Sequence, residues 1–191
     1  METVHSPLNT VRFVLFFLAA LTLFFSGCDK GIAPDPTGFS GVIRFRNWPR
    51  RDTVDFAVQE LRLVAFKKPP IDTTGLLIEF LKGNVVIYPP VGTPAFSKYY
   101  RASDSTLQLV DSIKYTVLLN MSVDDPPANY EYIAMAWRYG PNPFADWRPA
   151  GLYTTQPGTF NPGSITISKH DFLTNVNVNC DFQNPPPKPW R

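Results

Sequence analysis

The chain has 191 residues, with 18 Lys and Arg against 16 Asp and Glu, and only two cysteines and two histidines. This length suits one domain with its own core, and a net charge of +2 is too small to indicate a nucleic-acid-binding groove. Two Cys and two His exclude a disulfide scaffold and a Cys- or His-rich metal site within a single chain, so we expect no cofactor.

An apolar run near the N-terminus is the first informative segment. Residues 13–27 (FVLFFLAALTLFFSG) carry no charge and follow Arg12. As a helix, the run would cover roughly 22 Å, which is less than the ~30 Å hydrocarbon core of a bilayer. A basic residue, a short apolar run and small residues before a break are typical of a secretory signal peptide. The alternative is an uncleaved transmembrane anchor, beside which Cys28 would be an incidental thiol.

The end of this run resembles the lipobox of bacterial lipoproteins. Ser26 and Gly27 place small residues directly before Cys28, although Phe25 stands where the family usually has leucine. The resemblance implies that residues 1–27 are a signal peptide, cleaved between Gly27 and Cys28, and that the Cys28 thiol takes a thioether-linked diacylglycerol. Buried acyl chains contribute about 0.8 kcal/mol per CH₂ group, so several chains together anchor a protein stably.

The same resemblance implies a location in the bacterial cell envelope, with the domain outside the cytoplasm and the membrane as its partner through the lipid on Cys28. An aspartate at the place of Asp29 favours the inner membrane in enteric bacteria, but other bacterial groups do not follow this rule. Both membranes therefore remain open, and we expect the outer one. Residues 28–38 hold the lipidated cysteine and a Pro- and Gly-containing tether, which spans at most about 35 Å when extended.

From residue 39 onward, apolar and polar residues alternate with period two between turns rich in proline and glycine. This pattern predicts strands at residues 39–45, 60–66, 85–88, 106–110, 114–119, 130–138, 165–167 and 176–182. Seven or eight short strands with such turns are typical of an antiparallel β-sandwich. We therefore expect an all-β domain over residues 39–183, followed by a Pro-rich tail over residues 184–191.

One segment between the expected strands has helical spacing. In residues 74–82, Leu77, Phe80 and Leu81 recur at i, i+3 and i+4, after cap candidates at residues 72–74. A glycine and an asparagine follow directly and are typical of a helix end. The segment predicts one short crossover helix between two strands of the sandwich.

Three strand motifs carry a second resemblance. Residues 40–43 (SGVI), 115–119 and 130–136 are similar to strands of the carboxypeptidase-regulatory or prealbumin-like sandwiches attached to many bacterial surface proteins. An immunoglobulin-like topology would give much the same pattern. The resemblance implies a non-catalytic module and assigns no binding residues.

Candidates for catalysis are few. His170 is the one imidazole left once the leader is removed, and Asp171 beside it could orient the ring, with Ser164 or Ser168 as a nucleophile. No sharp strand-to-helix turn surrounds either serine, so we interpret this segment as a solvated turn. Cys180 lies on an apolar stripe and is expected to pack as a small hydrophobe. We expect no enzyme, and a hydrolase with a composite site around His170 is the enzymatic alternative.

Residues 137–153 (WRYGPNPFADWRPAGLY) concentrate aromatic and charged side chains. The candidates for ligand binding in this stretch are Trp137, Arg138, Tyr139, Trp147 and Arg148. Flat aromatic rings beside arginine can stack on sugar rings, or can anchor a protein partner. The alternative is structural, because a long Pro-rich loop needs aromatic side chains to hold it over the end of the sandwich.

These features together predict a lipid-anchored envelope protein. Its non-catalytic β-sandwich would serve in binding or assembly at the cell surface or in the periplasm, with an envelope protein or a glycan as partner and no nucleic acid. The alternative function is that of a glycan-binding lipoprotein, which would use the aromatic loop over residues 137–153.

Overall fold

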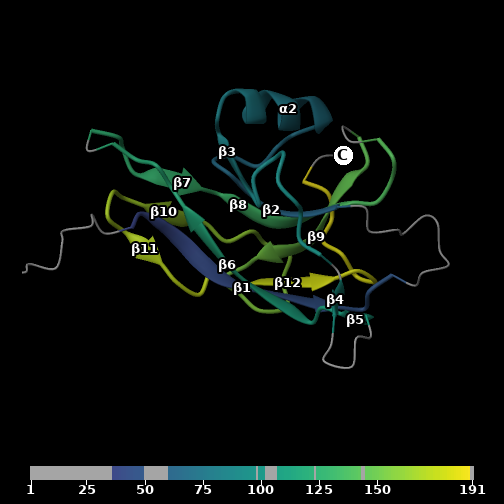
Figure 1. Ribbon diagram of the computed structural model, residues 1–191. Helices are drawn as coiled ribbons and strands as arrows, with labels where there is room; N and C mark the ends of the chain where they lie inside the picture. The colour runs from purple at the N-terminus through teal and green to yellow at the C-terminus, as the bar shows by residue number, and fades with distance from the viewer. Residues whose placement is uncertain are drawn as a thin grey trace, which may run out of the picture. The chain divides into compact units, whose positions relative to one another are not determined.

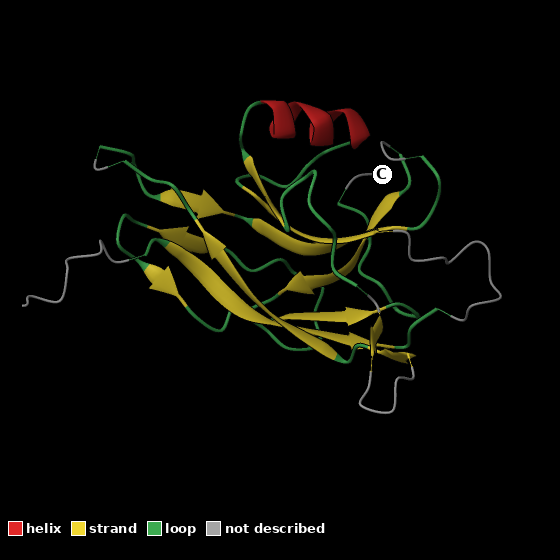
Figure 2. Ribbon diagram, in the orientation of Figure 1, coloured by secondary structure: helices red, strands yellow, loops and turns green. Residues whose placement is uncertain are grey.

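A computed structural model describes residues 36–49, 60–97, 99–101, 107–122, 124–142 and 145–189. These residues form a mostly β fold with a single short helix, α2 (Thr73–Leu81), shown in red in Figure 2. The strands are β1 (Gly38–Arg46), β2 (Glu60–Phe66), β3 (Val85–Tyr88), β4 (Tyr99–Arg101), β5 (Leu107–Leu109), β6 (Ser112–Leu118), β7 (Ala128–Tyr130), β8 (Tyr132–Arg138), β9 (Trp147–Tyr153), β10 (Ile165–Ile167), β11 (Phe172–Leu173) and β12 (Val178–Asp181). Among the described residues, no helix is long and apolar enough to cross a membrane.

One large curled sheet of eight strands dominates the fold (Figure 1). Strand β1 is bonded along both edges: β6 pairs with it antiparallel, while β11 and then β12 pair with it parallel on the other side. From β12 the sheet continues through β9, β8, β2 and β3 with antiparallel pairs. The all-β class is confirmed, but the expectation of a purely antiparallel sheet is wrong. Alternation reports which face of a strand is buried and not the direction of its partner.

Two short strand pairs stand apart from the large sheet. The pair β7–β10 brings Tyr130, Ile165 and Ile167 into the main core, and the second pair is β4–β5. The expected strands at residues 39–45, 60–66 and 85–88 are confirmed to within a residue or two.

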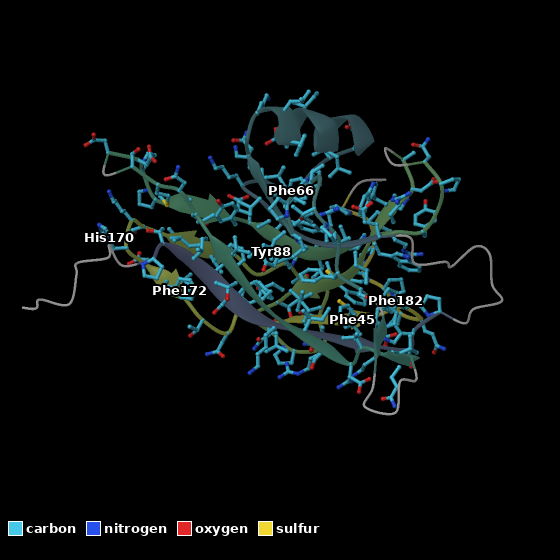
Figure 3. The ribbon with its side chains drawn as sticks, in the orientation of Figure 1. Phe45, Phe66, Tyr88, His170, Phe172 and Phe182 are labelled. Atoms are coloured by element: carbon cyan, nitrogen blue, oxygen red, sulfur yellow. The ribbon has the colours of Figure 1, made fainter. Side chains whose placement is uncertain are left out.

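One face of the large sheet carries the main core, and part of the other face is also covered, at β2, β3, β8 and β9. The main core lies on one face and is built on fully buried side chains such as Phe39, Leu61 and Trp137. A smaller cluster lies on the other face, where Phe66, Tyr132, Ala134 and Leu152 pack with Leu76 of α2. Phe66 is seen in this layer below the helix in Figure 3. Successive side chains of a strand point to opposite faces, so β2 and β8 are buried on both sides.

The backbone of β1 closely approaches the chain that joins β11 to β12. A Cβ atom on Gly41 would sit 2.2 Å from the carbonyl oxygen of Val176, so only glycine fits there. The Val42 amide donates to the side-chain oxygen of Asn177 at 2.8 Å, and the Val176 amide donates to the Ser40 carbonyl at 3.0 Å. These two bonds connect β1 to the segment between β11 and β12, so this edge of β1 is bonded along its length.

Tyr115 on β6 secures the same close approach, because its buried hydroxyl donates a hydrogen bond to the Val176 carbonyl. The Tyr132 hydroxyl, in contrast, is buried and makes no hydrogen bond within the described part of the chain. Both hydroxyls are buried, but among the described residues only that of Tyr115 makes a hydrogen bond, so Tyr132 serves as the control for Tyr115.

Replacing Tyr115 by Phe should lower the free energy of unfolding by about 1–2 kcal/mol, because it deletes this bond and leaves a buried carbonyl without it. Tyr132→Phe should be neutral or stabilising, since it removes a buried hydroxyl that has no partner. Urea denaturation of both variants measures the difference. An equal loss in the two variants would show that the Tyr115 hydrogen bond contributes nothing specific.

Candidate functional site

The predicted lipidation site lies outside the described residues. This applies to both Gly27 and Cys28, and the folded unit begins at Pro36. Thr37 is already buried and β1 begins at Gly38, so the fold starts within the range of residues 28–38 that we expected to be a tether. Residues 29–35 can separate Cys28 from the folded unit by at most about 25 Å.

The aromatic stretch over residues 137–153 is largely a strand hairpin and not the long loop that the sequence indicates. Its beginning belongs to β8, its end forms β9, and the Tyr139 amide donates to the Asp146 carbonyl at 3.0 Å in the connection. Pro149 lies opposite Ala136, where the register between β8 and β9 shifts. Such an irregularity tolerates a proline within a strand. The loop expectation is wrong because Pro149 conceals the strand pattern.

Trp137 is a core residue. It is 0% exposed, with its ring centroid 5.0 Å from that of Phe182 and 6.2 Å from that of Tyr139. The Arg148 guanidinium lies over the Trp137 ring, 5.5 Å from the centroid. Trp137 therefore has no exposed ring face on which a sugar could stack.

The other candidates of this stretch are half-buried, and two of them, Tyr139 and Arg148, contact the Trp137 ring. These candidates are Arg138, Tyr139, Trp147 and Arg148. The C-terminal segment covers part of this end, because Pro186 is buried and the Lys188 ammonium lies 5.7 Å from the ring centroid of Tyr139. A ligand at this end would contact Tyr139, Trp147 or Arg148, and the glycan hypothesis remains a prediction.

Arg138 belongs to an ion-pair network that the sequence analysis missed. The Glu60 carboxylate accepts from the Arg138 Nε atom at 3.2 Å and also from the Nε atom of Arg62. Arg62 is 8% exposed, and its terminal nitrogens donate to the carbonyl oxygens of Pro89, Pro90 and Thr93 at 2.7–2.9 Å. Glu60 and Arg62 are two residues apart on one strand and so share a face, which the sequence could have indicated. The network holds the segment after β3 against β2.

Replacing Arg62 by Met should lower the free energy of unfolding by about 2–4 kcal/mol. The Pro89 and Thr93 carbonyls lose the Arg62 donor, while Glu60 keeps its bond from Arg138 and the Pro90 carbonyl keeps its bonds from Thr93. The Thr93 amide, which donates to the Pro90 carbonyl at 3.1 Å, should exchange its hydrogen faster. The exposed Arg44→Met variant is the control and should lie near the wild type. An Arg62→Met protein as stable as this control would contradict the structural role of Arg62.

The catalytic candidates Ser168, His170 and Asp171 lie in the turn between β10 and β11. His170 is exposed at φ 67° in the turn between β10 and β11, and its backbone amide donates to the Thr37 hydroxyl at 2.9 Å. The Asp171 carboxylate accepts from the Ser168 amide at 2.9 Å, so it closes the turn. Figure 3 shows His170 at the opposite end of the fold from Phe182.

The buried thiol and the carboxylates add no reactive centre in the described part of the chain. Cys180 is 1% exposed, and burial raises the pKa of its thiol well above the ordinary value. A protonated, buried thiol is a poor nucleophile. Within the same residues, no group of three or more His, Cys, Asp and Glu side chains could hold a metal ion.

Helix α2 carries the most unusual exposed surface among the described residues. The predicted helix is confirmed, displaced by one residue, and its first turn is capped by the Asp72 carboxylate, which accepts from the Gly75 amide. Of the expected apolar stripe, however, Leu81 is 74% exposed and Phe80 is 44% exposed. Ile78 is also exposed, at 41%. The helix therefore packs on the sheet through Leu76 and directs much of its apolar surface outward.

Lysines border these apolar side chains. Lys82 follows the last turn of the helix, with its ammonium 3.8 Å from the Glu79 carboxylate. The Lys67 amide donates to the Asn84 carbonyl at 3.0 Å, which places Lys67 and Lys68 beside the C-terminal end of α2. We call the following exposed set the α2 surface: Lys67, Lys68, Ile71, Ile78, Phe80, Leu81 and Lys82.

No protein-family model, no curated protein and no solved structure matches the chain significantly. The resemblances to bacterial lipoproteins and to prealbumin-like sandwiches therefore stay predictions from the sequence.

Proposed function

We propose that the chain is a lipid-anchored protein of the bacterial cell envelope, whose β domain serves in binding or assembly outside the cytoplasm. The observation that carries this proposal is the uncharged run over residues 13–27, which ends in Ser26, Gly27 and Cys28. The run is shorter than the roughly 20 residues that a transmembrane helix needs, and it has the composition of a secretory signal peptide. A thiol directly after small residues is the group that lipoproteins acylate.

The start of the folded unit supports this proposal. Because the fold begins at Pro36, a lipid on Cys28 would hold the domain within about 25 Å of the membrane surface. The outer membrane is the location that we propose, with the domain facing the periplasm or the cell exterior.

A binding or assembly role agrees with the structural role of several charged side chains of the domain. Glu60, Arg62 and Asp171 hold strands and turns together through the bonds described above. The loops and the α2 surface remain as contact surfaces on a rigid β scaffold, which is where binding residues usually lie.

Metabolic labelling with radioactive palmitate in a bacterial host tests the proposal. The wild-type chain should incorporate the label, and Cys28→Ser should lose it, because a serine hydroxyl does not replace the lipidated thiol. Cys180→Ala is the matched control and should keep the label, since it removes the chain's other cysteine. Label that persists in Cys28→Ser would contradict lipidation at this residue.

A further inference from the structure

We infer that the α2 surface lies against the anionic headgroups of the membrane that holds the lipid anchor. This inference rests on the proposed lipidation of Cys28 and assigns the orientation of the domain on the bilayer. The first observation that supports it is which face of α2 points away from the sheet. Ile78 and Leu81 are three residues apart and share the outward face of α2, whereas Leu76 and Glu79 share the inner one.

An ordinary surface helix exposes polar side chains on its outward face, whereas α2 places Ile78 and Leu81 there. Leu81 is 74% exposed and Ile71, just before the helix, is 81% exposed. Ile78 and Leu81, one turn apart, form an exposed apolar patch of the kind that marks a contact surface, and Ile71 lies at the other end of the helix. A nine-residue helix is about 14 Å long, so it cannot cross a bilayer but can lie in the interface.

The charges around the helix favour a lipid surface over an apolar protein groove. Lys67 and Lys68 are exposed, and no ion pair involves either of them within the described residues. Three acidic groups lie nearby. Asp72 caps the helix, and Glu79 contacts Lys82 and accepts from Asn84 at 3.0 Å. Glu131, whose amide donates to the Phe66 carbonyl at 3.0 Å, accepts from the Asn129 side chain at 3.2 Å. Exposed lysines beside inserted apolar side chains match anionic headgroups.

With the proposed lipid anchor in place, a surface as small as the α2 surface is sufficient to orient the domain on the membrane. A tether of at most about 25 Å keeps the domain close to the bilayer, so contact of the α2 surface with lipid is an intramolecular step. The effective concentration of the membrane is then high, and a few apolar side chains and lysines can set the orientation.

The test places an environment-sensitive nitrobenzoxadiazole label on Leu81→Cys in the full chain. The protein is purified from membranes and reconstituted in phosphatidylcholine vesicles with or without phosphatidylglycerol. Leu109→Cys is the matched control, because Leu109 is 41% exposed, as Ile78 is, but belongs to β5, which lies at the bottom of Figure 1 whereas α2 lies at the top. Labelling of the chain without an introduced cysteine gives the background, and Ile78→Cys is a second variant should Leu81→Cys fold poorly.

The label at residue 81 should show a severalfold rise and a blue shift in emission with phosphatidylglycerol vesicles, while the label at residue 109 should not. Replacing Lys67 and Lys68 by Glu should reduce the response. Unchanged emission at both residues 81 and 78 would overturn the inference, as would a response that depends on protein concentration but not on lipid, which would indicate a second copy.

The mass of the Cys28 peptide from the same preparation separates the two proposals. A diacylglycerol adduct with no response at residue 81 leaves lipidation standing and overturns the membrane contact of α2. A response at residue 81 without an adduct supports the membrane contact and contradicts the proposed lipidation.

Discussion

The bonding of β1 along both of its edges is the constraint on which the rest of the fold depends. The first strand pairs with β6 on one side and with β11 and β12, the last strands, on the other, so the sheet is complete only when the C-terminal segment is in place. Gly41 permits the approach of Val176, and Tyr115 ties that carbonyl to β6. Pairing between the two ends of a chain is a long-range contact, and such contacts slow folding. The lipid that we propose on Cys28 would be joined through the tether to β1, a strand that is bonded along both of its edges.

The parts of the fold that could be predicted from the sequence are those governed by local pattern. The alternation at residues 60–66 coincides with β2, and the capped apolar segment after Asp72 forms α2. The direction of pairing could not be predicted, because a period of two is the same in parallel and antiparallel sheets. Strand β9 was missed because Pro149 and Gly151 resemble a loop. Pro149 lies at a register shift, and a Cβ atom on Gly151 would sit 2.2 Å from the Asn179 carbonyl oxygen.

The exposure of the candidate surfaces could not be predicted from the sequence either. An aromatic cluster in a sequence does not reveal which rings face the core, and Trp137 proves to be fully buried while Trp147 is half-buried. The helical stripe that includes Leu81 has the spacing of a core face, yet the helix docks through Leu76 and turns Leu81 outward. Spacing fixes which residues share a face, whereas the docking of the helix decides which face is covered. The predicted lipidation motif differs from these surfaces, because it consists of contiguous residues and does not depend on how the domain folds.

The intact mass of the protein extracted from membranes, with the mass of its N-terminal peptide, tests the central claim most directly. A chain that begins at Cys28 and carries an adduct of diacylglycerol size is the result that lipid anchoring predicts. A chain that retains residues 1–27 and carries no adduct would contradict it, and residues 13–27 would then be a retained anchor.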